Sequence, residues 1–116
     1  MSRIKHEVVK VVVNEQRIHT LRVAQTFRQR LLGWGLRNRC DGVWLLPCRA
    51  VHTIGMCEPI GLLWLDKNGQ LQHVDNLIVP NRVIRYGAAY SVIELPSAVL
   101  PTKVHSIKLV TQGCVT

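Results

Sequence analysis

Short apolar segments separated by turn residues recur along this chain, which is the pattern of a strand-rich domain. Near the N-terminus, residues 4–13 are dense in valine, and residues 17–23 mix apolar with basic side chains. Both segments predict strands, because β-branched side chains fit an extended, pleated backbone better than a helix. Asn14 and Glu15 lie between them and favour a tight turn. The first part of the chain therefore predicts a β-hairpin.

The middle of the chain carries a second hairpin signal. Residues 60–65 form an apolar run of strand length, and Asp66-Lys67-Asn68-Gly69 separates them from residues 70–74. An Asn-Gly pair favours a hairpin because it adopts the positive φ angles that tight hairpin turns require. Length and apolar or alternating pattern predict further strands at 43–46, 50–54, 79–84, 90–95 and 105–111.

One short helix interrupts the predicted strands. Thr26 and Gln29 are spaced as in a capping box, whose side chains satisfy free backbone N–H groups at a helix start. The helix is predicted over 27–32, because Gly33 can adopt the left-handed conformation that ends helices. With many short strands and one helix, the sequence predicts a mainly β fold. We expect a compact β-sandwich or jelly-roll-like barrel with one short α-helix, not alternating βαβ units.

Length and composition favour one domain over residues 1–116. The chain is 47% hydrophobic, enough for a core that needs neither disulfides nor a structural metal. No apolar run approaches the roughly 18 residues that cross a bilayer, and charges occupy residues 1–7, where a cleaved leader would be apolar. We therefore expect a cytoplasmic protein with no membrane span, whose four cysteines are reduced thiols.

The chain is basic, with 15 Lys and Arg against 7 Asp and Glu and a formal net charge of +8. Such a charge favours anionic partners and permits nonspecific binding to nucleic acid. One segment holds several arginines and no acidic residue before Asp41. Its candidate nucleic-acid or polyanion contacts are Arg22, Arg28, Arg30, Arg37 and Arg39. The alternative is a solvated basic surface, because no aromatic residues for base stacking alternate with these arginines.

Thiols and imidazoles are present, but their spacing matches no standard catalytic or metal motif. Cys40, Cys48, His52 and Cys57 are the conceivable zinc ligands, although cysteine is often simply a small buried apolar residue. Cys48 and His52 would lie about 13 Å apart along a strand, too far for proton transfer, although a turn at Arg49 would bring them closer. We expect no catalytic residue, no metal and no cofactor, with a hydrolase or metal-dependent enzyme as an alternative.

Glu94 is a carboxylate within the apolar segment 90–95. A carboxylate that points into a core needs a partner, since burying an unpaired charge is costly. The sequence therefore favours an outward or edge position for Glu94, beside an arginine.

The longest motif in the chain is the run Cys48-Arg49-Ala50-Val51-His52-Thr53-Ile54-Gly55-Met56. It continues through Pro59-Ile60 to Leu65-Asp66-Lys67-Asn68-Gly69. This run resembles the signature of a widespread prokaryotic family, domain of unknown function 192. Further matching positions are Ala24, Thr26, Arg30, Leu31, Gly33, Pro80, Arg82, Val83 and Glu94-Leu95-Pro96. The resemblance covers about residues 20 to 100 and implies a compact all-β domain of jelly-roll-like or sandwich type with a short helix.

The same resemblance implies candidate ligand-binding residues but no established activity. They are Arg49, His52, Thr53, Met56 and Glu94. Two positions depart from the family pattern, since Gly61 stands where members have Asp and Cys57 where they have a basic residue. The alternative for His52 and Thr53 is architectural, closing hydrogen bonds at a buried bend.

The sequence as a whole favours a noncatalytic binding or interaction module for a small ligand or a protein partner. Neither the ligand nor the partner is identified by any motif. Binding of nucleic acid or another polyanion through the arginine-rich segment is the second hypothesis.

Overall fold

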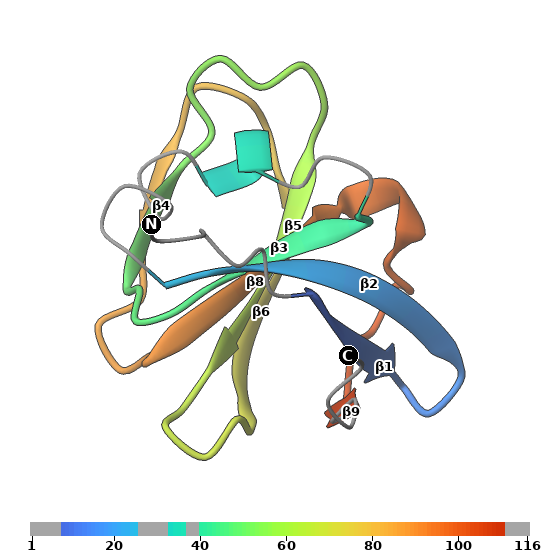
Figure 1. The fold of residues 1–116 in the computed structure, drawn as a ribbon. Coiled ribbons are helices and arrows are strands. Elements are labelled where there is room, and N and C mark those ends of the chain that lie inside the picture. Colours follow the sequence, from blue (N-terminus) through green and yellow to red (C-terminus); the bar gives the residue numbers. More distant parts are fainter. Residues whose placement is uncertain (1–7, 26–32, 37–39, 111–116) are drawn as a thin grey trace, which may run out of the picture.

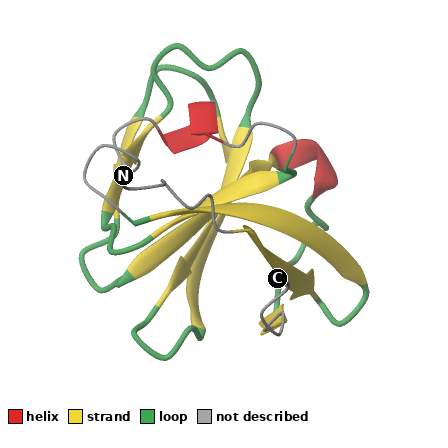
Figure 2. Cartoon of the chain, in the orientation of Figure 1, coloured by secondary structure: helices red, strands yellow, loops and turns green. Residues whose placement is uncertain are grey.

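The computed structural model describes residues 8–25, 33–36 and 40–110. Its strands are β1 (Val8–Val13), β2 (Arg17–Ala24), β3 (Gly42–Leu45), β4 (Ala50–His52), β5 (Ile60–Leu65), β6 (Leu71–Ile78), β7 (Val83–Arg85), β8 (Ser91–Pro96) and β9 (Ile107–Val110). Two short 3-10 helices, η1 (Gly33–Leu36) and η2 (Ser97–Val99), accompany them (Figure 2). No helix in these described ranges is long and apolar enough to cross a membrane.

The described strands form one large sheet and one small one (Figure 1). The seven-stranded sheet has the order β6-β5-β8-β3-β2-β1-β9 and is strongly curled, while β4 and β7 make a separate two-stranded sheet. Neighbouring strands are antiparallel except β2 and β3, which run parallel. The predicted compact, mainly β fold is confirmed. The helix predicted over 27–32 lies outside the described residues.

The predicted N-terminal hairpin is present as β1 and β2, which pair in antiparallel register. Asn14 and Glu15 both have positive φ, 52° and 61°, and so make the tight turn expected of them. The Asn14 side chain also donates to the Lys103 carbonyl at 2.8 Å and accepts from the His105 N–H at 2.9 Å. The turn thereby anchors the segment that leads into β9.

The second predicted hairpin is also confirmed, as β5 and β6. Gly69 has a φ of 80°, and the Asp66 carboxylate accepts from the N–H groups of Asn68 and Gln70 within the turn. β6 continues to Ile78, four residues beyond the predicted end at residue 74. This extension became possible because β5 supplies pairing partners along the whole strand, with irregular register at two points.

Apolar side chains gather on both faces of the large sheet. The first core cluster contains Ala24, Val43, Leu45, Val51, Ile60, Leu62, Trp64, Ala89 and Val92. The second core cluster contains Val11, Leu21, Leu63, Leu65, Ile93 and Leu95. Successive residues of β5 and β8 alternate between the two clusters, as the two-residue period of a strand requires. Because both faces are covered, β5 is buried along its whole length.

Gly42 begins β3 where this strand passes close to β8. A Cβ at this position would overlap the backbone oxygen of Glu94, which cannot move aside within a central strand. Gly42→Ala is therefore expected to lower the free energy of unfolding by about 2 kcal/mol, as overpacked cores do. Urea denaturation measures the change, and Gly87→Ala is the control because nothing lies within 4 Å of a Cβ there. Equal stability of the two variants would contradict the expectation.

Candidate functional site

Glu94 lies in the centre of the large sheet and is 2% exposed. Its strand, β8, runs between β3 and β5, and Glu94 is paired in register with Val43 on one side and Leu62 on the other. The predicted outward or edge position for Glu94 is therefore wrong. The prediction rested on the cost of burying an unpaired carboxylate, but both faces of β8 are covered by apolar clusters.

A second charged residue lies in the same row of the sheet. Arg22 of β2 is paired with Val43, which separates it from Glu94. Residues opposite one another in register point to the same face of a sheet. Arg22 and Glu94 therefore share the face that carries Val43 and Leu62, which we call the Glu94 face. Two strand spacings separate their backbones by about 10 Å.

Both side chains bury a polar atom that lacks a hydrogen-bond partner in the described part of the chain. These atoms are the Nε of Arg22 and the Oε1 of Glu94. Burial raises the pKa of Glu94 from 4.5 to about 8, because the charged form is poorly solvated there. The Glu94 carboxyl is thus mainly protonated at neutral pH and can donate a hydrogen bond, as the Arg22 guanidinium does.

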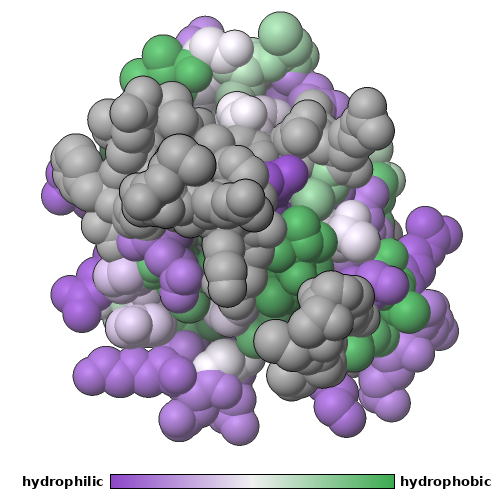
Figure 3. Space-filling model, in the orientation of Figure 1, coloured by the Kyte–Doolittle hydropathy of each residue, from purple (hydrophilic) through white to green (hydrophobic). Residues whose placement is uncertain are grey.

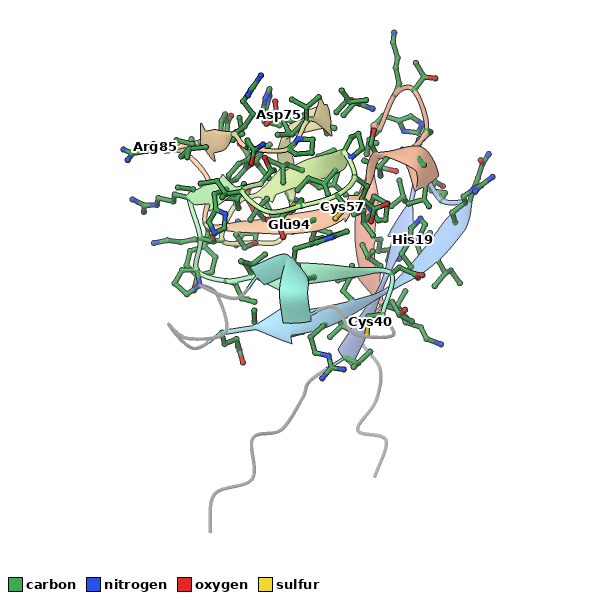
Figure 4. The ribbon with its side chains drawn as sticks, turned by 90° about the horizontal axis from the view of Figure 1, so that it is seen from above. His19, Cys40, Cys57, Asp75, Arg85 and Glu94 are labelled. Carbon is green, nitrogen blue, oxygen red and sulfur yellow. The ribbon has the colours of Figure 1, made fainter. Side chains whose placement is uncertain are left out.

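Side chains from three other segments cover the Glu94 face. Trp34 of η1, Met56, and Tyr86 beyond the end of β7 pack against the first core cluster. Each of the three is only half-buried, so the cluster reaches the surface beside them. In Figure 4, Glu94 lies near the middle of the molecule, whereas Arg85 lies at its periphery. Met56 is thus a candidate ligand-binding residue that the structure brings to the same cluster as Val43 and Leu62.

The Glu94 face ends at β6, where aromatic and acidic side chains lie together. The indole N–H of Trp64 donates to the Asp75 carboxylate at 3.0 Å, and His73 Nε2 lies 3.1 Å from its other oxygen. The His73 ring stacks on Tyr86 with the ring centroids 5.0 Å apart. Sequence reasoning missed this group, although the aromatic and acidic residues of the second hairpin at alternating positions were a visible signal.

Thr53 is completely buried at the bend that follows β4. Its hydroxyl donates to the Val79 carbonyl at 2.8 Å and accepts from the Arg82 N–H at 2.9 Å. Its backbone N–H donates to the Arg82 carbonyl, and its own carbonyl accepts from the N–H of Asn81. Thr53 therefore holds the loop after β6 against the bend after β4.

Arg49 and His52 are exposed and do not converge on Glu94. The Nε of Arg49 donates to the Ala89 carbonyl at 3.2 Å, and His52 Nδ1 accepts from the Ile54 N–H at 3.3 Å. The enzyme hypothesis needed either a bound metal or a pocket in which His52, a cysteine and Glu94 meet within hydrogen-bond reach. That meeting is absent, because His52 faces outward from β4 and Glu94 is buried in β8.

The described cysteines are separate thiols. Cys48 donates its S–H to the Ala50 carbonyl, Cys57 is exposed, and Cys40 is half-buried. Within the described ranges, no three His, Cys, Asp or Glu side chains are grouped to hold a metal ion. Cys114 lies outside these ranges, as do the nucleic-acid candidates Arg28, Arg30, Arg37 and Arg39.

Gly61, where the resembled family has Asp, points away from the Glu94 face. It precedes Leu62 in β5, and a Cβ there would overlap the side chain of Leu100. Leu100 packs against the second core cluster. An acidic side chain at this position would therefore face the opposite side of the sheet from Glu94.

A cavity of about 250 Å³ lies elsewhere, between the β1–β2 turn and residues 98–101. Val13, Arg17 and Leu100 contribute to its lining. None of the candidate ligand-binding residues lines it. The candidate site and this cavity are therefore separate features of the molecule.

Two solved structures have similar folds. One is a protein of unknown function from Novosphingobium aromaticivorans, with a TM-score of 0.67, 18% identity, and coverage of 90% of this chain and 85% of that chain. The other is a candidate transcription regulator from Sinorhizobium meliloti, with a TM-score of 0.68, 16% identity, and coverage of 93% and 98%. The chain matches no protein-family model and no curated protein, so its resemblance to domain of unknown function 192 stays a prediction.

Proposed function

We propose that this protein is a noncatalytic binding module that takes a small acidic molecule on the Glu94 face. One observation carries the proposal. Arg22 Nε and Glu94 Oε1 are buried on the same face of one sheet, and neither has a hydrogen-bond partner in the described residues. Buried polar groups are nearly always hydrogen-bonded, so two such atoms without a partner in the same row of the sheet call for an explanation.

The chemistry of the two groups indicates the kind of ligand. Arg22 is a permanent cation and only donates, while Glu94, neutral at pH 7, can donate its proton. Two donors on one face suit a ligand with acceptor oxygens and a negative charge, such as a carboxylate. A cationic ligand is disfavoured because it would meet the positive charge of Arg22 and an uncharged Glu94, while the Asp75 carboxylate at the end of the face is engaged by Trp64 and His73.

The rest of the face suits an apolar body attached to that acid. Val43 and Leu62 flank Glu94 within the sheet, and Met56 and Trp34 pack over the same cluster. Each methylene that a ligand buries against such side chains contributes about 0.8 kcal/mol, or about fourfold in affinity. We therefore infer a monocarboxylic acid with a short alkyl or aryl chain.

Calorimetric titration with straight-chain carboxylates, from acetate to octanoate, tests the proposal at pH 7. The matched primary amides keep each chain but remove the charge. We expect the carboxylates to bind at least about tenfold more tightly than the amides, which is the gain of a charge-assisted hydrogen bond. Affinity should also rise with chain length.

Two substitutions locate the site. Arg22→Met removes the cation and should weaken carboxylate binding at least about tenfold, whereas Arg17→Met removes an exposed arginine of the same strand and should leave binding unchanged. Glu94→Gln keeps a donor and should retain binding that Glu94→Leu loses. Equal affinity for acids and amides, equal losses in Arg22→Met and Arg17→Met, or no binding of any acid would each refute the proposal.

A further inference from the structure

Exposed aliphatic side chains gather at one end of the molecule. Ile54 and Val83 are each 61% exposed and Val79 is 38% exposed, and we call these three residues the apolar tip. His52 is paired with Val83, and Ile54 follows two residues after His52. Figure 1 shows the loops after β4 and before β7 side by side at the top of the molecule, and Figure 3 shows green apolar atoms at this end.

The apolar tip is held in place by backbone hydrogen bonds. Thr53 joins its two loops through Val79, Asn81 and Arg82. Asn81 has a positive φ of 66° at the loop's turn. Because both loops are tied to the same buried threonine, Ile54 and Val79 cannot fold back into the core without breaking these bonds.

The surroundings of the apolar tip are basic. Residues 49–57 and 77–85 contain three arginines, one histidine and no carboxylate. The arginines, Arg49, Arg82 and Arg85, are all exposed. The next carboxylate along the chain, Glu58, is half-buried. This end therefore offers apolar side chains together with positive charge. The two properties together match a partner that has an anionic surface over an apolar layer.

We propose that the apolar tip and its arginines dock on an anionic lipid surface. The exposed side chains are aliphatic and lie on two loops and on the first residue of β7, so they suit insertion among lipid headgroups and not stacking of nucleic-acid bases. Arg82, which adjoins Val83, and Arg85, two residues further along β7, suit phosphate groups. A single weak attachment to a membrane is readily reversed. Stable docking therefore needs both the inserted aliphatic side chains and the arginine contacts.

Flotation with vesicles tests this proposal on the full chain. Vesicles of phosphatidylcholine with about 30% phosphatidylserine should bind the protein, and binding should weaken with added salt. Vesicles of phosphatidylcholine alone should bind far less. Arg82→Ala with Arg85→Ala should weaken binding about 30-fold, since each basic residue near an anionic leaflet contributes about fivefold.

Matched variants separate the apolar tip from general properties of the protein. Ile54→Ser with Val83→Ser should abolish binding, whereas Ile18→Ser changes a residue of β2 that is 62% exposed and should not. Lys103→Ala with Lys108→Ala is the charge control. Circular dichroism checks that each variant folds.

Several outcomes would overturn the proposal. They are equal binding to neutral and anionic vesicles, equal losses of binding in Ile18→Ser and in Ile54→Ser with Val83→Ser, and no binding to either kind of vesicle. Single-stranded DNA binding that the Arg82 and Arg85 changes abolish, without vesicle binding, would assign the surface to nucleic acid instead. Ultracentrifugation showing a dimer that Ile54→Ser dissociates would assign it to self-association.

Discussion

Glu94→Gln is expected to stabilise the protein, and the gain should grow from almost nothing at pH 4 to about 4 kcal/mol at pH 8. The carboxyl is buried without a hydrogen-bond partner for Oε1 in the described residues, and burial raises its pKa from 4.5 to about 8. Each unit of pKa difference between the folded and unfolded chains changes the free energy of unfolding by about 1.4 kcal/mol. Glutamine has nearly the same shape and no charge to lose.

The direction of this pH dependence follows from where the proton is held. Below pH 4.5 the carboxyl is protonated in both states and contributes no difference. Between pH 4.5 and about 8 the unfolded chain releases the proton while the folded protein retains it, so the unfolded state is increasingly favoured. Above pH 8 both states are ionised and the difference stops growing. Glutamine removes this whole dependence.

Urea denaturation at pH 4, 6 and 8 measures the effect, with the exposed Glu15→Gln as the matched control. His19 adds its own dependence, because burial lowers the pKa of its imidazole below 6.5. As pH falls below 6.5, the unfolded chain gains a proton that the folded protein resists, and stability declines. This contribution is common to all variants and cancels in their differences. Parallel curves for the wild type and Glu94→Gln would contradict the expectation.

Thr53→Val should lower the free energy of unfolding by about 3 kcal/mol. Valine matches threonine in shape but lacks the hydroxyl, so the Val79 carbonyl loses its donor and the Arg82 N–H loses its acceptor. Leaving a buried polar group unpaired costs about 1–3 kcal/mol, and two groups are affected here.

Thr53→Ser is the control, since serine keeps the hydroxyl and loses only a methyl group, at a cost of about 1 kcal/mol. Chemical denaturation measures both variants, and amide exchange at Arg82 should accelerate in Thr53→Val alone. If Thr53→Val and Thr53→Ser lowered the free energy of unfolding by the same amount, the hydroxyl would not hold the two loops together. That result would favour ligand binding over an architectural role as the interpretation of Thr53.

The unpaired carboxyl of Glu94 links stability with the proposed binding. A ligand oxygen that accepted its proton would supply the missing partner and would stabilise the folded state in proportion to ligand concentration and affinity. A protein that binds acids there should therefore melt at a higher temperature in their presence. The same acids should not raise the melting temperature of Glu94→Leu.

Local sequence determined most strand positions and both hairpins. The valine-rich residues of β1, the Asn14-Glu15 turn, and the Asn68-Gly69 turn each specify backbone conformation through their own chemistry. The interactions involved join residues close in the chain, so they can be predicted without knowing which strands are neighbours. The mainly β class followed from the same short-range patterns.

The environment of Glu94 depended on long-range pairing instead. The parallel pairing of β2 with β3 and the position of β8 between β3 and β5 bring Arg22 and Glu94 into one row. Alternation in residues 90–95 distinguished two sides of a strand, but a strand alone cannot show whether each side meets solvent or another layer. That depends on segments distant in sequence, including Trp34 and Met56 above the sheet. The sequence therefore determined where the chain extends and turns, and the tertiary structure decided which of its charges would be buried.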